Sequence, residues 1–220
     1  MPHLPRPRFA TLAALLIAAP AAAQACPTAT TTTDILVTYE TAPDERFTPP
    51  QGRMESRVVR LAPQGDTAGD VEIVRLAGVI DHQISLLDGD RHPHTLLLVE
   101  TDLSPLLPLT PHQRLSVEAG VYRFTPPDAS AREMREAIEQ WRPATLRVST
   151  GPKQIATIGT CRYSSLTVEV RFSGPDSEEP EITSYLTYLP ELGIALRQSD
   201  WFPRYDPIIY EPQSISTVAP

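Results

Sequence analysis

Proline divides this chain into short segments. The 220 residues include 24 prolines, about twice the usual share, and proline is excluded from helix interiors and central strands because it lacks a backbone N–H. Between the prolines lie short runs rich in β-branched residues, as is typical of strands. Leu166–Phe172 alternates apolar and polar residues throughout, so we expect one face in a core and the other in water. The sequence therefore predicts a mostly β protein of about eleven strands.

The connections between these strands are expected to be loops rather than domain boundaries. Residues 42–53 and 174–180 are rich in proline and charge, which is typical of exposed connections. Two expected strands, 146–149 and 155–163, flank Gly151-Pro152. We expect this dipeptide to form a turn that leaves Lys153 solvated.

One segment has the pattern of a helix. Thr125 can cap it, and Pro126 stands at its first position. Its apolar residues fall at i, i+3, i+4 and i+7; they are Met134, Ala137, Ile138 and Trp141. We therefore expect one amphipathic helix over 126–141, packed on the sheet through this stripe.

The N-terminus has the three parts of a secretory signal peptide. Residues 1–8 carry Arg6 and Arg8 and no acid, Phe9–Ala19 is almost purely apolar, and Ala23-Gln24-Ala25 offers small residues for cleavage. The apolar run is shorter than the roughly 20 residues of a membrane span. We expect residues 1–25 to be removed and residues 26–220 to form a single β-rich domain in the periplasm, without a transmembrane segment.

Cys26 and Cys161 are the two cysteines. In an oxidising, exported compartment such a pair more often forms one disulfide than two free thiols. Alternatively, Cys26 could be acylated as in bacterial lipoproteins, because it directly follows the expected cleavage point; free thiols are the third reading. The disulfide is favoured, because acylation would leave Cys161 unpaired and because Ala23 stands where lipoprotein signals usually carry Leu.

The standard motifs of catalysis and cofactor binding are missing from the sequence. His92-Pro93-His94 has a spacing that could bind zinc, but Pro93 interrupts a strand at the place where the pair would need to be held. Glu178-Glu179 lies in a polar, Pro-flanked loop, which favours solvated carboxylates over a catalytic pair. We assign no catalytic, cofactor-binding or metal-binding residue.

The charge balance limits the partners. The formal net charge is -8, and Lys153 is the one lysine beside 18 arginines. An acidic chain is repelled by the phosphates of nucleic acids and by anionic membranes, so we expect no nucleic-acid partner. The arginines do not cluster along the sequence, and a GC-rich coding sequence is the simplest cause of their excess over lysine.

The second half of the chain resembles a known architecture. Ile158–Tyr163, then an alternating strand, then Tyr185–Arg197 with a turn marked by Pro190 and Gly193, is similar to the closing hairpins of exported bacterial curved-sheet proteins of the outer-membrane lipoprotein carrier type. This resemblance implies a curved antiparallel sheet, a half-barrel or open barrel, with the amphipathic helix packed on it. In the carriers, the concave face of such a sheet holds acyl chains.

Three functions follow from these patterns. The leading hypothesis is a non-catalytic cell-envelope protein that binds a hydrophobic or amphiphilic ligand, such as a lipid or acyl chain, or an envelope protein partner, in a concave sheet, without a cofactor. The alternative is a structural or assembly protein of the envelope, recognised through an exposed strand edge or through Trp201–Tyr210, where aromatic residues lie among prolines. The third is an uncharacterised hydrolase-type enzyme.

Overall fold

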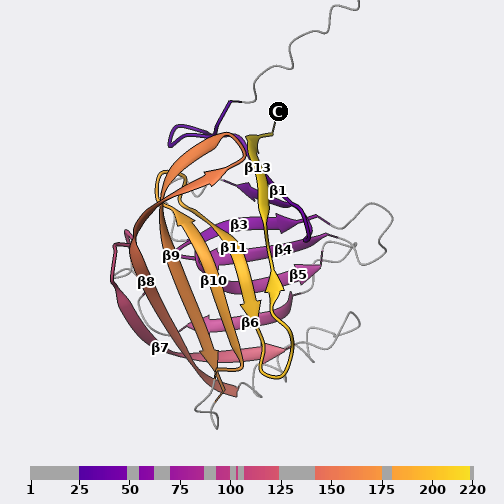
Figure 1. The fold of residues 1–220 in the computed structure, drawn as a ribbon. Coiled ribbons are helices and arrows are strands. Elements are labelled where there is room, and N and C mark those ends of the chain that lie inside the picture. The colour runs from indigo at the N-terminus through magenta and orange to yellow at the C-terminus, as the bar shows by residue number, and fades with distance from the viewer. Residues whose placement is uncertain are drawn as a thin grey trace, which may run out of the picture.

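The computed structural model describes residues 25–48, 55–61, 70–86, 93–99, 103, 107–123, 142–174 and 180–218, and these contain strands and no helix. All pairings are antiparallel. They join one 13-stranded sheet in the order β12-β11-β10-β9-β8-β7-β6-β5-β4-β3-β2-β1-β13 (Figure 1). The strands are β1 (Ile35–Tyr39), β2 (Glu45–Thr48), β3 (Glu55–Arg60), β4 (Val71–Leu76), β5 (Ile80–Leu86), β6 (Pro93–Val99), β7 (Arg114–Arg123), β8 (Arg142–Ile158), β9 (Cys161–Ser173), β10 (Ile182–Leu189), β11 (Ile194–Trp201), β12 (Ile208–Ile209) and β13 (Pro212–Thr217).

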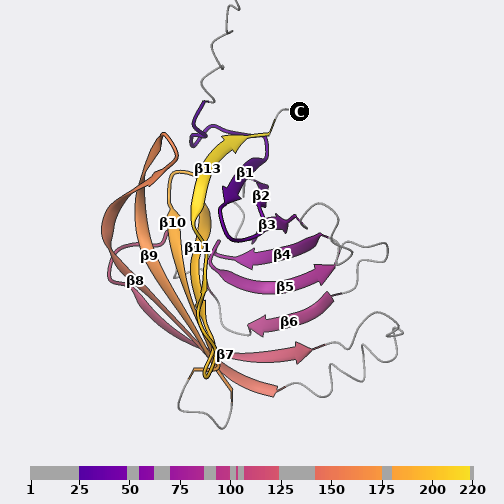
Figure 2. The same ribbon diagram turned by 45° about the vertical axis from the view of Figure 1, so that its right-hand side comes forward.

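The sheet folds back on itself into two layers. Figure 2 shows β8–β11 and β13 running steeply in one layer and β4–β6 running across in the other. β7 lies between β6 and β8 in the hydrogen-bonded order, where one layer passes into the other. A twisted sheet of this many strands curls in this way because its apolar faces are then buried against each other.

The C-terminal segment connects the two edges of the sheet. β12 pairs with β11 at one edge, and β13 pairs with β1 at the other. The residues between them continue both contacts: the Tyr210 amide donates to the carbonyl of Gln198 at 2.9 Å, and the Glu40 amide donates to that of Glu211 at 3.1 Å. Ten consecutive residues thus hold the two layers together along this side.

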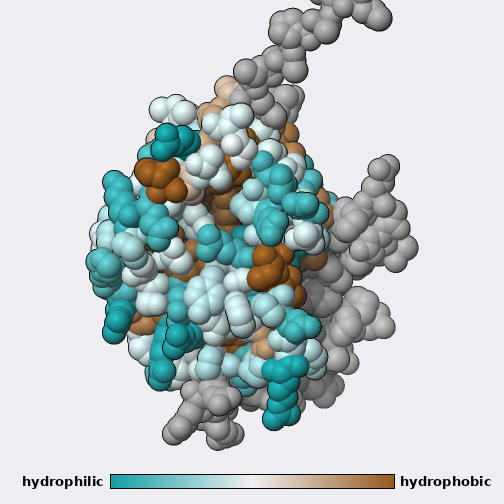
Figure 3. All heavy atoms as spheres, viewed as in Figure 1, coloured by the Kyte–Doolittle hydropathy of each residue, from teal (hydrophilic) through white to brown (hydrophobic). Residues whose placement is uncertain are grey.

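The core lies between the layers and follows the alternation of the strands. Ile35, Val37 and Tyr39 of β1 are buried, as are Leu166 and Val168 of β9, while the residues between them are half-buried. Each such aliphatic side chain contributes about 1.5–3 kcal/mol when it is fully buried. The outer face of the front layer is mostly hydrophilic (Figure 3).

A disulfide joins Cys26 to Cys161, with Cα atoms 5.6 Å apart. It ties the segment before β1 to the start of β9, where the Tyr163 hydroxyl also donates to the carbonyl of Pro27 at 3.1 Å. Because 135 residues separate the two cysteines, the chain-entropy model assigns the bridge on the order of 5 kcal/mol. Disulfides of this kind form in oxidising compartments.

The prediction of a mostly β protein with an antiparallel sheet is confirmed, and so is the disulfide. The helix predicted over 126–141, with Met134, Ala137, Ile138 and Trp141, lies outside the described residues. Residues 1–24 of the predicted signal peptide lie outside them as well. No helix in the described part of the chain is long and apolar enough to cross a bilayer.

The turn predicted at Gly151-Pro152 is wrong. β8 continues through these residues with a register shift between Thr150 and Lys153, so Lys153 lies on a strand. A bulge at this point accommodates Pro152, which has no N–H to give to the ladder. The chain reverses at Gly159-Thr160 instead, inside the segment 155–163 predicted as one strand, and Gly159 has a φ of 56° there, which glycine adopts without strain.

Candidate functional site

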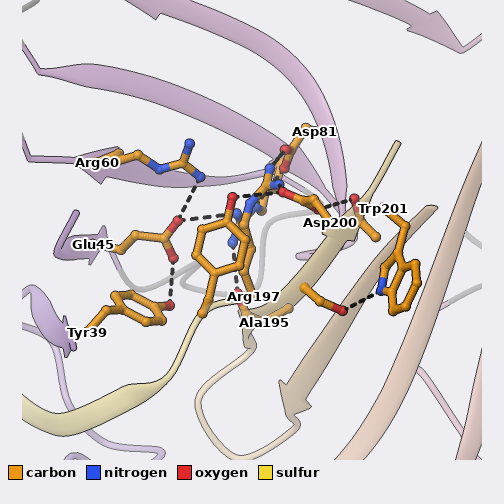
Figure 4. Close-up of polar contacts among 12 residues, drawn as sticks. Tyr39, Glu45, Arg60, Asp81, Ala195, Arg197, Asp200 and Trp201 are labelled. Carbon is orange, nitrogen blue, oxygen red and sulfur yellow. Dashed lines mark hydrogen bonds and ion pairs between the residues drawn. The ribbon is translucent and has the colours of Figure 1, made fainter. Parts of the chain in front are cut away.

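A cluster of charged side chains lies between the two layers. Its six members come from the consecutive strands β2 to β5 and from the distant strand β11, and Figure 4 shows how most of them meet. They are Glu45 of β2, Arg60 of β3, Arg75 of β4, Asp81 of β5, and Arg197 and Asp200 of β11. Three guanidinium groups thus face three carboxylates, and the net charge of the cluster is zero. Such a balance is needed because a buried charge without a partner is costly.

Arg75 and Glu45 are the most deeply buried members, each with 1% of its side chain exposed. Nε of Arg75 donates to Oδ1 of Asp81 at 2.7 Å, and its Nη1 donates to the carbonyl of Ala195 at 2.7 Å. Asp81 is also the cross-strand partner of Arg75 in the β4–β5 ladder. Arg75 therefore binds β5 and β11 at once and links one layer to the other.

Arg197 forms the second link between the layers. Its Nη2 pairs with Asp81, and its Nη1 pairs with Asp200 on its own strand. Burial alone would raise the pKa of Asp81, but the charges of Arg197 and Arg75 outweigh it and hold that pKa below its usual value. Asp81 is therefore a carboxylate fixed between two guanidinium groups.

Asp200 accepts hydrogen bonds from two hydroxyl groups. The Ser184 hydroxyl donates to its Oδ1 at 2.5 Å, and the Tyr210 hydroxyl donates to its Oδ2 at 2.9 Å. Burial, and then the charge of Asp200, raises the pKa of Tyr210 to about 12. The Arg197 guanidinium also stacks over the Tyr210 ring at 5.9 Å, so Tyr210 remains a neutral donor packed on a cation.

Glu45 accepts hydrogen bonds on the opposite side of the cluster. Its Oε1 accepts from Nη2 of Arg60 at 3.2 Å, and its Oε2 accepts from the Tyr39 hydroxyl at 2.9 Å. Burial, followed by the charge of Glu45, raises the pKa of Tyr39 well above its usual value. Arg60 keeps 24% of its side chain exposed, so it is the most accessible cation of the cluster.

A cavity of about 410 Å³, called the internal cavity below because it lies between the layers, adjoins this cluster and is partly open to the outside. This volume falls in the range of small-molecule sites, about 300–1,000 Å³. Most of its wall is apolar, and the polar groups come from the charged cluster and from Ser184 and Tyr210, which donate to Asp200. The lining residues are Arg60, Val79, Ile80, Asp81, Ile84, Leu97, Val121, Leu146, Val170, Phe172, Ile182, Ser184, Leu186, Arg197, Asp200, Phe202, Ile208 and Tyr210.

Several apolar residues of this wall are incompletely buried although they point inward. Val121, Val170 and Phe172 pack against the core but remain partly exposed. Neighbours on the same strand faces, such as Leu146, are 3% exposed. The wall of the cavity is therefore shielded from solvent at Leu146 and more accessible next to Val170, and apolar surface faces the cavity at both positions.

The residues singled out from the sequence lie elsewhere. The structure places Pro190 and Gly193 in the β10–β11 turn, where the Gly193 amide donates to the carbonyl of Leu189 at 2.9 Å and Gly193 has a φ of 66°. His92 lies outside the described residues. Within the described ranges, no group of three or more His, Cys, Asp or Glu side chains could hold a metal ion.

Sequence reasoning missed the charged cluster, although a signal for it was present. Arg75 stands two residues after Ile73, and Glu45 stands two residues before Phe47. Positions two apart share one face of a strand, so each charge lies on the face that carries a buried apolar residue. A charge at such a position indicates a buried ion pair or a site rather than a solvated side chain.

Comparison with known proteins found no match to this chain among protein-family models, curated proteins or solved structures.

Proposed function

We propose that this protein is a non-catalytic binding protein that holds a hydrophobic or amphiphilic ligand in the cavity between its two layers. The single observation that carries the proposal is the combination of an apolar cavity of about 410 Å³ with one charged wall. A cavity of about 150 Å³ holds benzene, so this one has room for on the order of 15 non-hydrogen atoms, the size of a medium-chain fatty acid.

The arrangement of the wall supports an orientation for the ligand. The apolar chain would contact Val121, Val170 and Phe172, and the polar end would lie toward Arg60, where the guanidinium is accessible. The six charged residues are occupied with one another, which suits a rigid wall better than a reacting centre. With the disulfide and the signal-peptide pattern, the proposal places this activity in the periplasm.

A cavity-filling variant tests the proposal. Val170→Trp puts an indole into the cavity, and Ile155→Trp is the matched control, because Ile155 is 60% exposed on β8. We expect decanoic acid to displace anilinonaphthalene sulfonate from the parent protein and from the control. We expect Val170→Trp to bind about tenfold more weakly or not at all, while its thermal unfolding remains cooperative. Equal binding by all three proteins would reject the cavity as the site.

A second candidate function is recognition by an envelope protein through the loop that follows β11. The observation that favours it is a set of apolar side chains left exposed: Trp201 is 49% exposed, Tyr205 78%, Ile208 47% and Ile209 45%. A photo-crosslinking residue at position 205 would report such a partner in cells. A discrete crosslinked product that Ile209→Ser abolishes supports this candidate, and its absence rejects it.

A further inference from the structure

A second concave site lies on the outer face of the front layer, away from the internal cavity. It is a groove of about 970 Å³ over β7–β10, and its charged residues are Arg114, Arg147, Glu169 and Arg171. Figure 3 shows hydrophilic side chains gathered on the left of this face, where β8 and β9 run. None of these four residues lines the internal cavity.

The strand register brings the three arginines together. Arg147 of β8 stands directly opposite Arg171 of β9. Arg114 of β7 stands opposite Ser149, which places it diagonal to Arg147. Directly opposed residues have Cβ atoms about 4.5–5.5 Å apart, and diagonal ones about 7–8 Å, within reach of long side chains. All three guanidinium groups can therefore converge on one point above the sheet.

These arginines are incompletely neutralised. Arg171 pairs with Glu169 through its Nε, whereas Arg114 and Arg147 form no ion pair with any described residue. The groove thus holds three guanidinium groups against one carboxylate, a surplus of two positive charges, in a chain of net charge -8. Like charges placed directly opposite destabilise a sheet, and a bound anion removes that cost.

From this geometry we propose that the groove binds a phosphate group. A phosphate monoester carries about two negative charges at neutral pH, which matches the surplus of the groove, whereas a carboxylate would compensate half of it. Its oxygens accept paired hydrogen bonds from planar guanidinium groups. The arginines stand on paired strands, which hold them more precisely than a loop would.

Calorimetric titration with inorganic pyrophosphate tests the proposal, with acetate as the singly charged probe. Arg147→Gln and Arg171→Gln remove a guanidinium from the groove, and Arg162→Gln is the matched control, because Arg162 is exposed on β9 outside it. We expect pyrophosphate to bind the parent protein and the control alike. Each groove variant should bind about tenfold more weakly, and acetate should not bind measurably.

Thermal unfolding separates binding from a structural role. Without an anion, Arg147→Gln should melt at the same temperature as the parent protein or above it, because it removes a like-charge pair. With pyrophosphate, the parent protein should gain stability and the variant should gain less. A lower melting temperature of Arg147→Gln in anion-free buffer would overturn the proposal, because Arg147 would then stabilise the folded protein by itself.

Vesicle binding distinguishes the source of the phosphate. If phosphatidylcholine vesicles that contain phosphatidic acid bind the parent protein and not the Arg147→Gln and Arg171→Gln variants, the groove binds a lipid headgroup. If pyrophosphate binds and the vesicles do not, it takes a phosphate in solution. Absence of binding to both, or equal weakening by all three substitutions, refutes the site without bearing on the internal cavity.

Discussion

Replacing Arg75 with methionine is the sharpest perturbation of the link between the layers. Methionine fills much of the same volume without charge. The substitution removes the ion pair with Asp81 and the hydrogen bond to the carbonyl of Ala195. Three carboxylates would then face two guanidinium groups in the interior, so one buried negative charge would be uncompensated.

The expected cost follows from the burial of the pair. Breaking a buried ion pair by removing one partner costs about 3–5 kcal/mol, because the remaining charge stays buried. The whole protein is expected to be stable by about 5–15 kcal/mol, so Arg75→Met would remove a large part of its stability. Arg57→Met is the matched control: Arg57 lies 3.4 Å from Glu72 with 59% of its side chain exposed, and such a pair contributes about 0–1 kcal/mol.

Urea unfolding of both variants measures the difference. The midpoint for Arg75→Met should fall well below that of Arg57→Met, and adding salt should leave this gap nearly unchanged, because a buried pair is poorly screened. Adding Glu45→Gln to Arg75→Met should recover part of the loss by restoring the charge balance. The reasoning is refuted if the two single variants have similar midpoints, since Arg75 would then contribute no more than a surface arginine.

Four further predictions concern the stability of the fold. Cys161→Ser should lower the free energy of unfolding by about 2–5 kcal/mol, and reduction of the parent protein should produce the same loss in a urea titration. Gly159→Ala should lower the melting temperature, because Gly159 has a φ of 56° and an added Cβ would lie 3.0 Å from the carbonyl oxygen of Gln213; an unchanged melting temperature would contradict this. Asp81 has a lowered pKa, so the stability that it contributes is present above its unfolded pKa and is lost as the pH falls through its folded value. Tyr210 has its pKa raised from 10.0 to about 12, so the stability linked to it is present below pH 10 and is lost as the pH rises toward 12, which an ultraviolet titration of tyrosinate alongside unfolding would detect.

The strands could be predicted from the sequence where they obey alternation. Leu166–Phe172 shows it clearly, and the structure has β9 over Cys161–Ser173. β2 was missed, because Glu45–Thr48 has charged and polar residues at three of its four positions within a segment predicted as a loop. Its identity as a strand depends on pairing with β1 and β3, which a local pattern does not contain.

The candidate sites depend on contacts between distant segments. Asp81 and Arg197 are 116 residues apart, and the outer groove joins Arg114 to Arg171 across three strands. The arginines do not cluster along the sequence, but the fold brings three of them together in the outer groove. Strand register decides which side chains meet, and a one-residue slip would send them to the other face.

A local sequence pattern also could not decide the role of the C-terminal segment. Its aromatic residues could fill the core or form a surface. The structure divides them between the two roles: Tyr210 is buried against the charged cluster, while Trp201 and Tyr205 are exposed. Removal of everything after Asp200 would also remove β13, the partner of β1. Point substitutions therefore report on the exposed residues, and truncation does not.

Methyl-group NMR with decanoic acid is the most direct test of ligand binding between the layers. The methyl signals of Val121, Leu146 and Leu186, which line the cavity, should shift and broaden together as the acid is added. The methyl signals of the exposed Ile155 should stay in place. Shifts confined to exposed residues such as Ile155, Ile208 and Ile209, with the signals of Leu146 and Leu186 unmoved, would contradict the account.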